Sequence, residues 1–473
     1  MRRFPPAFSI IVGALAALAL GPVPGGAQAK ATPADRRLAR DIFKELIEIN
    51  TTDSLGNTPR AARAMAQRLL TAGFPAADVR VLVGPDSTHG NLVARYRGTG
   101  AGGRPIVVFA HLDVVPARRA DWSVEPFTLL EQDGYFYGRG TTDDKVGDAV
   151  LVADFIRLKQ AGFAPTRDLI LVLTGDEETL GSCIQWLVTE HRALIDAAFA
   201  LNTDAGGGVL RDGGRVLFEV QASEKVYATY VLEATDKGGH SSLPRPADNP
   251  IYRLAAALER IAQYQFPVKL NEVSRAFFER SAAIETGQVA ADMRRVLQTP
   301  PDSAAVTRLA AAPFYNSKLR TTCVATMMEA GHAENALPQT ARATVNCRIL
   351  PGEPAAEVEA TLRRLAADPR ITVRTTYGAI ASPASPLTPA IMGPIERLVA
   401  RQFPNVPVVP VMEAGATDGL FLRNAGIPTY GVSAVFEDRN DVRAHGRDER
   451  IGVESFYDAL EFWYQMMQAF TAP

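Results

Sequence analysis

Short apolar runs alternate in the first half of the chain with stretches whose apolar residues recur at helical spacing. The apolar spacing in residues 41–49, 58–72 and 145–160 is typical of helices that cover a sheet. Alternating strands and helices predict a mixed, mostly parallel α/β sheet. The runs that predict its strands are residues 79–83, 91–96, 106–112 and 169–174.

The pattern changes near Ser223. Strands and helices then follow the order β-α-β-β-α-β, which predicts a ferredoxin-like α+β domain. Its predicted elements are residues 226–235, 249–264, 322–329, 341–350, 355–367 and 371–377. Residues 266–320 interrupt this domain with inserted helices of unknown role.

A Pro- and Ser-rich linker, residues 381–389, precedes a return to the α/β pattern. We therefore expect residues 223–381 to form a domain inserted into a larger one. The larger domain would consist of residues 30–222 and 382–473.

Composition and charge limit the classes of partner. The chain has 473 residues, too many for one compact core, and its 47% hydrophobic and 22% charged residues are ordinary for a globular protein. A net charge of −2 gives no electrostatic basis for binding nucleic acid or an anionic membrane surface. We expect a small-molecule substrate instead.

Residues 1–29 resemble a secretory signal peptide, with Arg2 and Arg3, an apolar run over residues 10–20, and Ala27-Gln28-Ala29 as the cleavage site. An uncleaved anchor is the alternative, but the run is shorter than the roughly 20 residues that span a bilayer. The mature protein is therefore predicted to begin near Lys30 and to be secreted or periplasmic, with no membrane span.

The three cysteines are too few for a disulfide framework. Cys323 and Cys347 lie on two strands that are predicted to pair, so a bridge between them is possible in an oxidising compartment. Buried free thiols are the favoured interpretation, and Cys183 has no potential partner nearby in the sequence.

Polar residues follow three apolar strands. His111 and Asp113 end one strand and leave it on the same side, while Glu177 with Glu178, and Asp204, follow two others. His-x-Asp alone is more typical of a buried strand with a polar end. Because ligands bind outside the carboxyl ends of strands in open α/β sheets, we expect all three groups to meet at one edge.

Two further segments add metal-binding chemistry. Asp143 lies in a glycine-containing turn, residues 138–145, where it could equally cap the following helix, and His445 lies in a polar loop. Together with His111, Glu178 and Asp204, these residues form a donor set suited to two Zn²⁺ ions.

The motifs His111-Leu112-Asp113, Asp176-Glu177-Glu178 and Ala444-His445-Gly446, with residues 138–145 and 239–242, resemble the M20 metallopeptidase/amidohydrolase family. The resemblance covers nearly all of the mature chain. The insertion before Thr322 is most similar to the carboxypeptidase S-like branch.

The resemblance implies two zinc ions per subunit, with Co²⁺ or Mn²⁺ as substitutes. One ion would be held by His111, Asp143 and Asp204, and the other by Asp143, Glu178 and His445. Glu177 would be the general base, and Asp113 would orient His111 from behind. The larger domain would then be the catalytic domain.

The resemblance also implies that the inserted domain is a lid and dimerisation domain. His240 would reach the active site of the neighbouring subunit of a homodimer, Arg348 would bind the substrate carboxylate, and Asn335 would lie near that carboxylate.

Val146 replaces a glycine common in the family, and Asp204 stands where members have Asp or Glu, which leaves the subtype open. Asp418 fits a family motif in a substrate-facing loop but is equally typical of a turn.

The sequence therefore predicts an exported di-zinc hydrolase of carboxypeptidase or aminoacylase type, which cleaves the amide bond of short peptides or N-acyl amino acids with a free carboxylate. An aminopeptidase or dipeptidase is the main alternative. A metal-free binding protein on the same fold is less favoured, because neither the base nor any ligand is missing.

Overall fold

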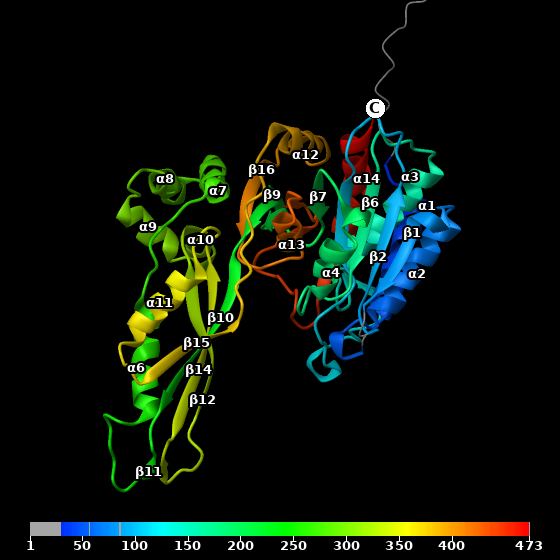
Figure 1. Ribbon diagram of the computed structural model, residues 1–473. Helices are drawn as coiled ribbons and strands as arrows, with labels where there is room; N and C mark the ends of the chain where they lie inside the picture. Colours follow the sequence, from blue (N-terminus) through cyan, green and yellow to red (C-terminus); the bar gives the residue numbers. More distant parts are fainter. Residues whose placement is uncertain (1–29, 56, 85–86, 473) are drawn as a thin grey trace, which may run out of the picture.

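The chain folds into two lobes (Figure 1). A computed structural model describes residues 30–55, 57–84 and 87–472, so the predicted signal peptide, residues 1–29, lies outside the described part. The larger lobe contains both ends of this part of the chain, and the smaller lobe is elongated (Figure 1). Within the described residues, every helix is too short or too polar to cross a membrane.

A mixed sheet forms the centre of the large lobe, and its middle strands are parallel. All residues of β3 and β6 are buried, as expected for strands covered on both faces. The predicted α/β fold is confirmed. In spatial order the strands are β1 (Val79–Val83), β2 (Gly90–Tyr96), β6 (Leu169–Thr174), β3 (Ile106–His111), β7 (Phe199–Asn202), β17 (Thr429–Gly431), β9 (Gly214–Glu224), β8 (Gly207–Arg211) and β18 (Phe436–Asp438), and β16 (Val408–Glu413) also pairs with β9.

Helices cover both faces of this sheet. One face carries α1 (Pro33–Glu48), α2 (Thr58–Thr71), α3 (Lys145–Gln160), α12 (Pro389–Gln402) and α14 (Val453–Thr471). The other face carries α4 (Ser182–Glu190), α5 (Arg192–Ile195) and α13 (Gly419–Asn424). Smaller elements are a sheet of β4 (Leu130–Gln132), β5 (Tyr135–Tyr137) and β19 (Arg450–Gly452), and 3₁₀ turns at Asp53–Leu55, Ala76–Asp78 and Arg119–Asp121.

The small lobe has the predicted β-α-β-β-α-β order. Its antiparallel strands lie in the spatial order β12 (Thr322–Ala330), β14 (Thr340–Ile349), β10 (Val226–Thr235) and β15 (Ile371–Tyr377). Helices α6 (Pro250–Gln263) and α11 (Ala355–Ala366) pack on one face, where they cover alternate residues of β10 such as Ala228, Tyr230 and Leu232. At the far tip, β11 (Gly239–His240) pairs with β13 (Ala336–Leu337). Only Lys225 separates β9 of the large sheet from β10 of the small one.

The inserted helices predicted within residues 266–320 are α7 (Glu272–Ile284), α8 (Gly287–Val296), α9 (Ser303–Ala310) and α10 (Pro313–Leu319). Phe277 and Phe278 of α7 share an apolar core with Val409 and Val411 of β16. These helices therefore pack on the large sheet, although the predicted range of the inserted domain, residues 223–381, included them.

The prediction of free thiols at Cys323 and Cys347 is wrong, because the two residues form a disulfide. They are directly opposite each other in β12 and β14, with their Cα atoms 4.1 Å apart. The sequence indicated that the strands pair but not in which register. Cys183 is a buried free cysteine whose pKa is raised by burial.

Candidate functional site

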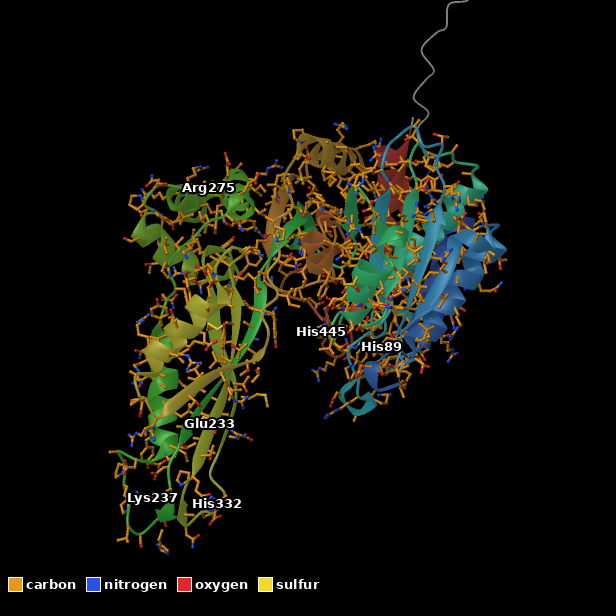
Figure 2. All side chains as sticks on the ribbon, in the orientation of Figure 1. His89, Glu233, Lys237, Arg275, His332 and His445 are labelled. Atoms are coloured by element: carbon orange, nitrogen blue, oxygen red, sulfur yellow. A yellow bond between two sulfur atoms is a disulfide. The ribbon has the colours of Figure 1, made fainter. Side chains whose placement is uncertain are left out.

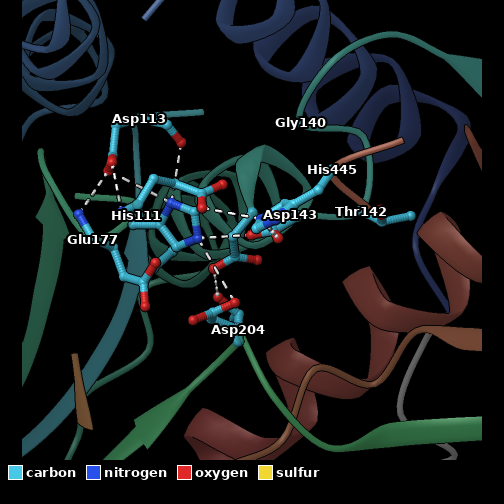
Figure 3. A network of polar contacts seen from close by, with 12 residues as sticks. His111, Asp113, Gly140, Thr142, Asp143, Glu177, Asp204 and His445 are labelled. Carbon is cyan, nitrogen blue, oxygen red and sulfur yellow. Dashed lines mark hydrogen bonds and ion pairs between the residues drawn. The ribbon is translucent and has the colours of Figure 1, made fainter. Parts of the chain in front are cut away.

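Three parallel strands end at the same edge of the large sheet. His111 is the last residue of β3, Glu177 and Glu178 follow β6, and Asp204 follows β7. Because β6 and β7 flank β3, the three strand ends bring these side chains together, as the sequence predicted (Figure 3).

Asp143 joins this cluster from the turn that precedes α3, and Glu449 holds that turn in place. The buried carboxylate of Glu449 accepts backbone N–H groups from Gly140 (3.1 Å), Thr142 (2.8 Å) and Asp143 (3.3 Å). It also pairs with the buried guanidinium of Arg139. A buried acid that accepts several N–H groups fixes a turn firmly, since leaving those donors unpaired would be costly.

Sequence reasoning missed Glu449. Its only signal was a pair of opposite charges, Arg139 in the first motif and Glu449 in the last, each close in sequence to a predicted ligand.

The carboxylate of Asp143 lies between two imidazoles. Its Oδ1 atom is 2.9 Å from Nε2 of His111, and its Oδ2 atom is 3.0 Å from Nε2 of His445. His111 Nε2 also lies 3.6 Å from Asp204 Oδ1, and His445 Nε2 lies 3.0 Å from Glu178 Oε2. Asp143 is thus common to two groups of donors, one with His111 and one with His445 (Figure 3).

Asp113 lies behind His111. Its backbone oxygen is 3.1 Å from Nδ1 of His111, and its Oδ1 atom is 3.6 Å from the same nitrogen. Its carboxylate accepts the backbone N–H groups of Glu177 (3.1 Å) and Glu178 (2.9 Å). Asp113 therefore ties the imidazole to the turn that carries both glutamates.

Burial and charge shift the pKa values of the cluster. Burial raises the pKa of Glu177 well above its usual range and that of Asp204 to about 7. Although burial opposes ionisation of Asp143, hydrogen bonds with His111 and His445 lower its pKa. Asp143 and Glu178 raise the pKa of His445 to about 10. The acids are thus crowded in a buried site that cations would stabilise.

The donor set fits metal ions. The potential ligand atoms of His111, Asp143 and Glu178 all lie within 4.8 Å of one another, and the same holds for His111, Glu177 and Asp204. In addition, Oε1 of Glu178 is buried without a hydrogen-bond partner. Imidazole nitrogens and carboxylate oxygens at such distances are the ligands that Zn²⁺ binds in hydrolytic sites.

A cleft of about 1060 Å³ extends from this cluster to the small lobe. On the small lobe it is lined by Lys225, Tyr227 and Arg348. Arg348 lies over the ring of Tyr227, 4.6 Å from its centroid, and burial lowers the pKa of its guanidinium. The predicted carboxylate-binding arginine therefore faces the same cleft as the metal-ligand cluster.

Asp418 also lines the cleft. It is buried, its Oδ2 atom has no hydrogen-bond partner, and burial raises its pKa to about 8. Nearby Asp176 has a different role, because its carboxylate accepts the backbone N–H groups of Ser182 and Cys183 and so caps helix α4. Only Asp418 of these two acids faces the cleft.

His240 and Asn335 lie together at the tip of the small lobe, where the N–H of Ser241 donates to the carbonyl of Asn335. Neither residue lines the cleft of its own chain. Strand β14 separates them from Arg348, and its ten residues span about 30 Å at roughly 3.3 Å each. Figure 2 shows this separation, with Lys237 and His332 at the tip and His445 in the large lobe. A single chain therefore does not bring His240 or Asn335 to the metal-ligand cluster.

Comparisons with known proteins agree with this architecture. The profile of peptidase family M20/M25/M40 matches residues 107–469. Human N-fatty-acyl-amino acid synthase/hydrolase PM20D1 is 30% identical over 377 residues, which are 77% of this chain and 74% of that protein. Carboxypeptidase S-like protein 2 of Dictyostelium discoideum is 26% identical over 397 residues, 80% of this chain and 74% of that protein.

Solved structures show the same fold. The M20 family metallo-carboxypeptidase Sso-CP2 from Sulfolobus solfataricus superposes with a TM-score of 0.70 at 17% identity, covering 91% of this chain and 99% of that one. A dinuclear metal-binding M20 peptidase from Bacillus subtilis superposes with a TM-score of 0.55 at 13% identity, covering 92% and 98%. The solved structures confirm the fold, and the family profile and the human relative confirm the family predicted from the motifs.

Proposed function

Because this chain belongs to peptidase family M20/M25/M40 and is a hydrolytic metalloenzyme of that family, we propose that it cleaves the amide bond of N-acyl amino acids or short peptides that carry a free carboxylate. The observation that carries this proposal is the carboxylate of Asp143, whose two oxygens each contact a different imidazole. Such a group can bridge two metal ions.

Two zinc ions are the proposed cofactors, with Co²⁺ or Mn²⁺ as substitutes. His111 and Asp204 with Asp143 would hold one ion, and Glu178 and His445 with Asp143 the other. When bound, such ions act as Lewis acids that polarise the amide carbonyl and lower the pKa of a water molecule.

Glu177 is the proposed general base. Its carboxylate lies with those of the ligands, within 4.8 Å of donor atoms of His111 and Asp204, and its pKa is raised by burial. It would take a proton from the attacking water and pass it to the leaving amine. Asp113 would support this step by holding the backbone of Glu177 and the ring of His111.

Arg348 is the proposed partner of the substrate carboxylate, because a guanidinium can bind a carboxylate through two parallel hydrogen bonds. The acyl group would lie against apolar side chains of the large lobe. Leu180, Leu420, Phe421 and Val442 line the cleft there. Leu180 and Val442 are exposed, and an apolar acyl group would cover them, which supports N-acyl amino acids as the first substrate class to test.

We further propose a homodimer in which His240 acts at the active site of the partner subunit, with Asn335 beside it. Strand β12 is an edge strand that exposes Val324 (61%) and Met327 (69%). An exposed apolar edge of this kind readily pairs with a second chain. The Nδ1 atom of His240 accepts the N–H of Ser242, so the neutral ring carries its proton on Nε2, available for donation to an oxyanion.

Export to the periplasm or the cell exterior is the proposed location. The disulfide between Cys323 and Cys347 supports it, because such bonds persist mainly in oxidising compartments. The leader sequence in residues 1–29 supports it as well.

A dipeptidase or aminopeptidase is the second candidate, because Glu413 and Glu437 also line the cleft. Burial raises the pKa of Glu437 to about 7, and a substrate ammonium group would stabilise its charged form.

A substrate panel would test the proposal. Purified protein loaded with Zn²⁺ would be assayed with N-acyl amino acids, their C-terminal amides and unblocked dipeptides. We expect the highest kcat/KM for N-acyl amino acids with a free carboxylate. A preference for unblocked dipeptides would favour the second candidate, and hydrolysis of none of the three classes would contradict the proposal.

A further inference from the structure

Lys225 occupies the junction between the two lobes. Its backbone N–H donates to the carbonyl of Glu413 in the large lobe (2.9 Å), while its ammonium donates to the hydroxyl of Thr322 in the small lobe (3.3 Å). The preceding residue, Glu224, is fixed in the large lobe by a buried ion pair with Arg423 at 2.7 Å. Lys225 is buried, yet it lines the cleft.

The register of the small sheet places Lys225 beside Arg348. Tyr227 of β10 and Thr322 of β12 are both directly opposite Arg348 of β14, so the three side chains leave the sheet on the same face. Lys225 precedes Tyr227 by two residues and continues the alternation on that face. This is the face that α6 and α11 leave uncovered.

In the described part of the chain, no carboxylate forms an ion pair or a hydrogen bond with Lys225 or Arg348. Burial, together with the positive charges of Lys318 and Arg348, lowers the pKa of Lys225 to about 7, while Glu353 acts in the opposite direction. A buried charge without a counter-ion is costly, so an anion bound between the two cations would be strongly favoured.

We propose that Lys225 is a second cation of the carboxylate subsite and binds the substrate's free carboxylate together with Arg348. This inference rests on the proposed function and adds a residue to it. The guanidinium of Arg348 supplies paired hydrogen bonds, and the ammonium of Lys225 supplies a compact point charge. Because Lys225 joins the lobes, a carboxylate bound there also contacts the junction between them.

Lys318 offers a matched control. It is a second buried lysine, and its ammonium donates to the carbonyl of Met412 and pairs with Glu413 at 3.7 Å. It does not line the cleft. Replacing Lys318 also removes a buried ammonium group. Unlike Lys225, Lys318 already pairs with a carboxylate of the protein, that of Glu413.

The test measures binding rather than turnover. In a zinc-loaded Glu177→Gln protein, calorimetry would compare an N-acyl amino acid with its C-terminal amide. Adding Lys225→Gln should weaken binding of the carboxylate about 10- to 100-fold, the range of one charged hydrogen bond, and leave the amide nearly unchanged. Lys225→Arg should keep most of the affinity. Lys318→Gln should lower the melting temperature without weakening the preference for the carboxylate, because loss of its positive charge raises the pKa of Lys225 and keeps the ammonium protonated.

The pH dependence gives a second readout that needs no substitution. The ammonium is lost as pH rises through about 7, so affinity for the carboxylate should fall above that pH while affinity for the amide does not. Lys225→Arg should move this decline to higher pH. If Lys225→Gln fails to fold, judged by circular dichroism, this comparison decides the question.

Equal binding of the carboxylate with and without Lys225→Gln, or an equal loss for the amide, would overturn the role of Lys225. If the wild-type enzyme hydrolyses N-acyl amino acids in that case, the proposed function stands and only this subsite is removed. If the parent protein binds neither ligand and the wild type hydrolyses neither, the proposed function and the subsite both fail.

Discussion

The two walls of the cleft differ in how their charges are held. On the large lobe, His445 contacts both Asp143 and Glu178 directly, and Glu449 fixes the turn that carries Asp143. On the opposite wall, Lys225 and Arg348 face the same cleft, and among the described residues no carboxylate forms an ion pair with either. The proposed metal ligands are thus held by contacts within one lobe, whereas the proposed carboxylate-binding cations have no such acidic contacts among the described residues.

The largest expected effect comes from the wall of the large lobe. Glu177→Gln keeps the size of the side chain but removes its ability to take a proton, so kcat should fall about 10²- to 10⁴-fold. Both metal ions should remain, because Glu177 is not among the proposed ligands. Steady-state kinetics and elemental analysis of the purified variant would measure both quantities.

Glu437→Gln is a suitable control, because Glu437 also lines the cleft but lies outside the ligand set. We expect it to retain most of the turnover of N-acyl amino acids. Near-normal turnover of Glu177→Gln would contradict the role of Glu177 as general base. Loss of metal from this variant would show that Glu177 is a metal ligand.

The next effect tests whether the small lobe acts across a dimer. His240→Ala should lower kcat about 10²- to 10³-fold, as expected for the loss of one oxyanion donor, with metal content unchanged. Mixing it with Glu177→Gln should restore activity, because a mixed dimer has one site with both Glu177 and His240 intact.

Subunit exchange would be verified by differently tagged chains, and up to half of the sites in mixed dimers should be active. Absence of recovery despite proven exchange would remove the action of His240 in trans. A fully active monomer would remove it too.

A smaller effect on catalysis is expected from the disulfide in the small lobe. Replacing Cys323 and Cys347 by serine opens a loop with a sequence separation of 24 and should lower the free energy of unfolding by about 3 kcal/mol. The kcat should stay nearly constant, since the proposed metal ligands and general base lie in the large lobe, and His240 lies at the tip of the small lobe, at the other end of the sheet from the disulfide. Denaturant titration would measure the free energy of unfolding, and steady-state kinetics would measure kcat. A large fall in kcat without a change in stability would contradict a purely structural role of the disulfide.

Patterns within single segments predicted that the proposed ligands cluster. The apolar runs that form β3, β6 and β7 are each followed by the expected polar residues, and the rule that ligands bind at the carboxyl ends of strands predicted that these residues lie together, as they do. The family resemblance supplied the roles of Arg348 and of a lid, which stay predictions.

Features that depend on packing between distant segments escaped prediction. Glu449 acts on a turn about 300 residues away, and the Cys323–Cys347 bond depends on a strand register that alternation alone does not determine. The packing of α7 on β16 joins segments more than 100 residues apart. Each required knowledge of which distant surfaces meet.

The most direct test of the account is a metal titration. Protein freed of metal with a chelator would receive Zn²⁺ in steps, while bound zinc and hydrolysis of an N-acyl amino acid are measured together. The account predicts that activity returns as zinc binds, up to two ions per chain, and that Asp143→Ala, which removes the shared ligand, binds neither ion tightly and stays inactive. Full activity without metal, or two tightly bound ions in Asp143→Ala, would contradict it.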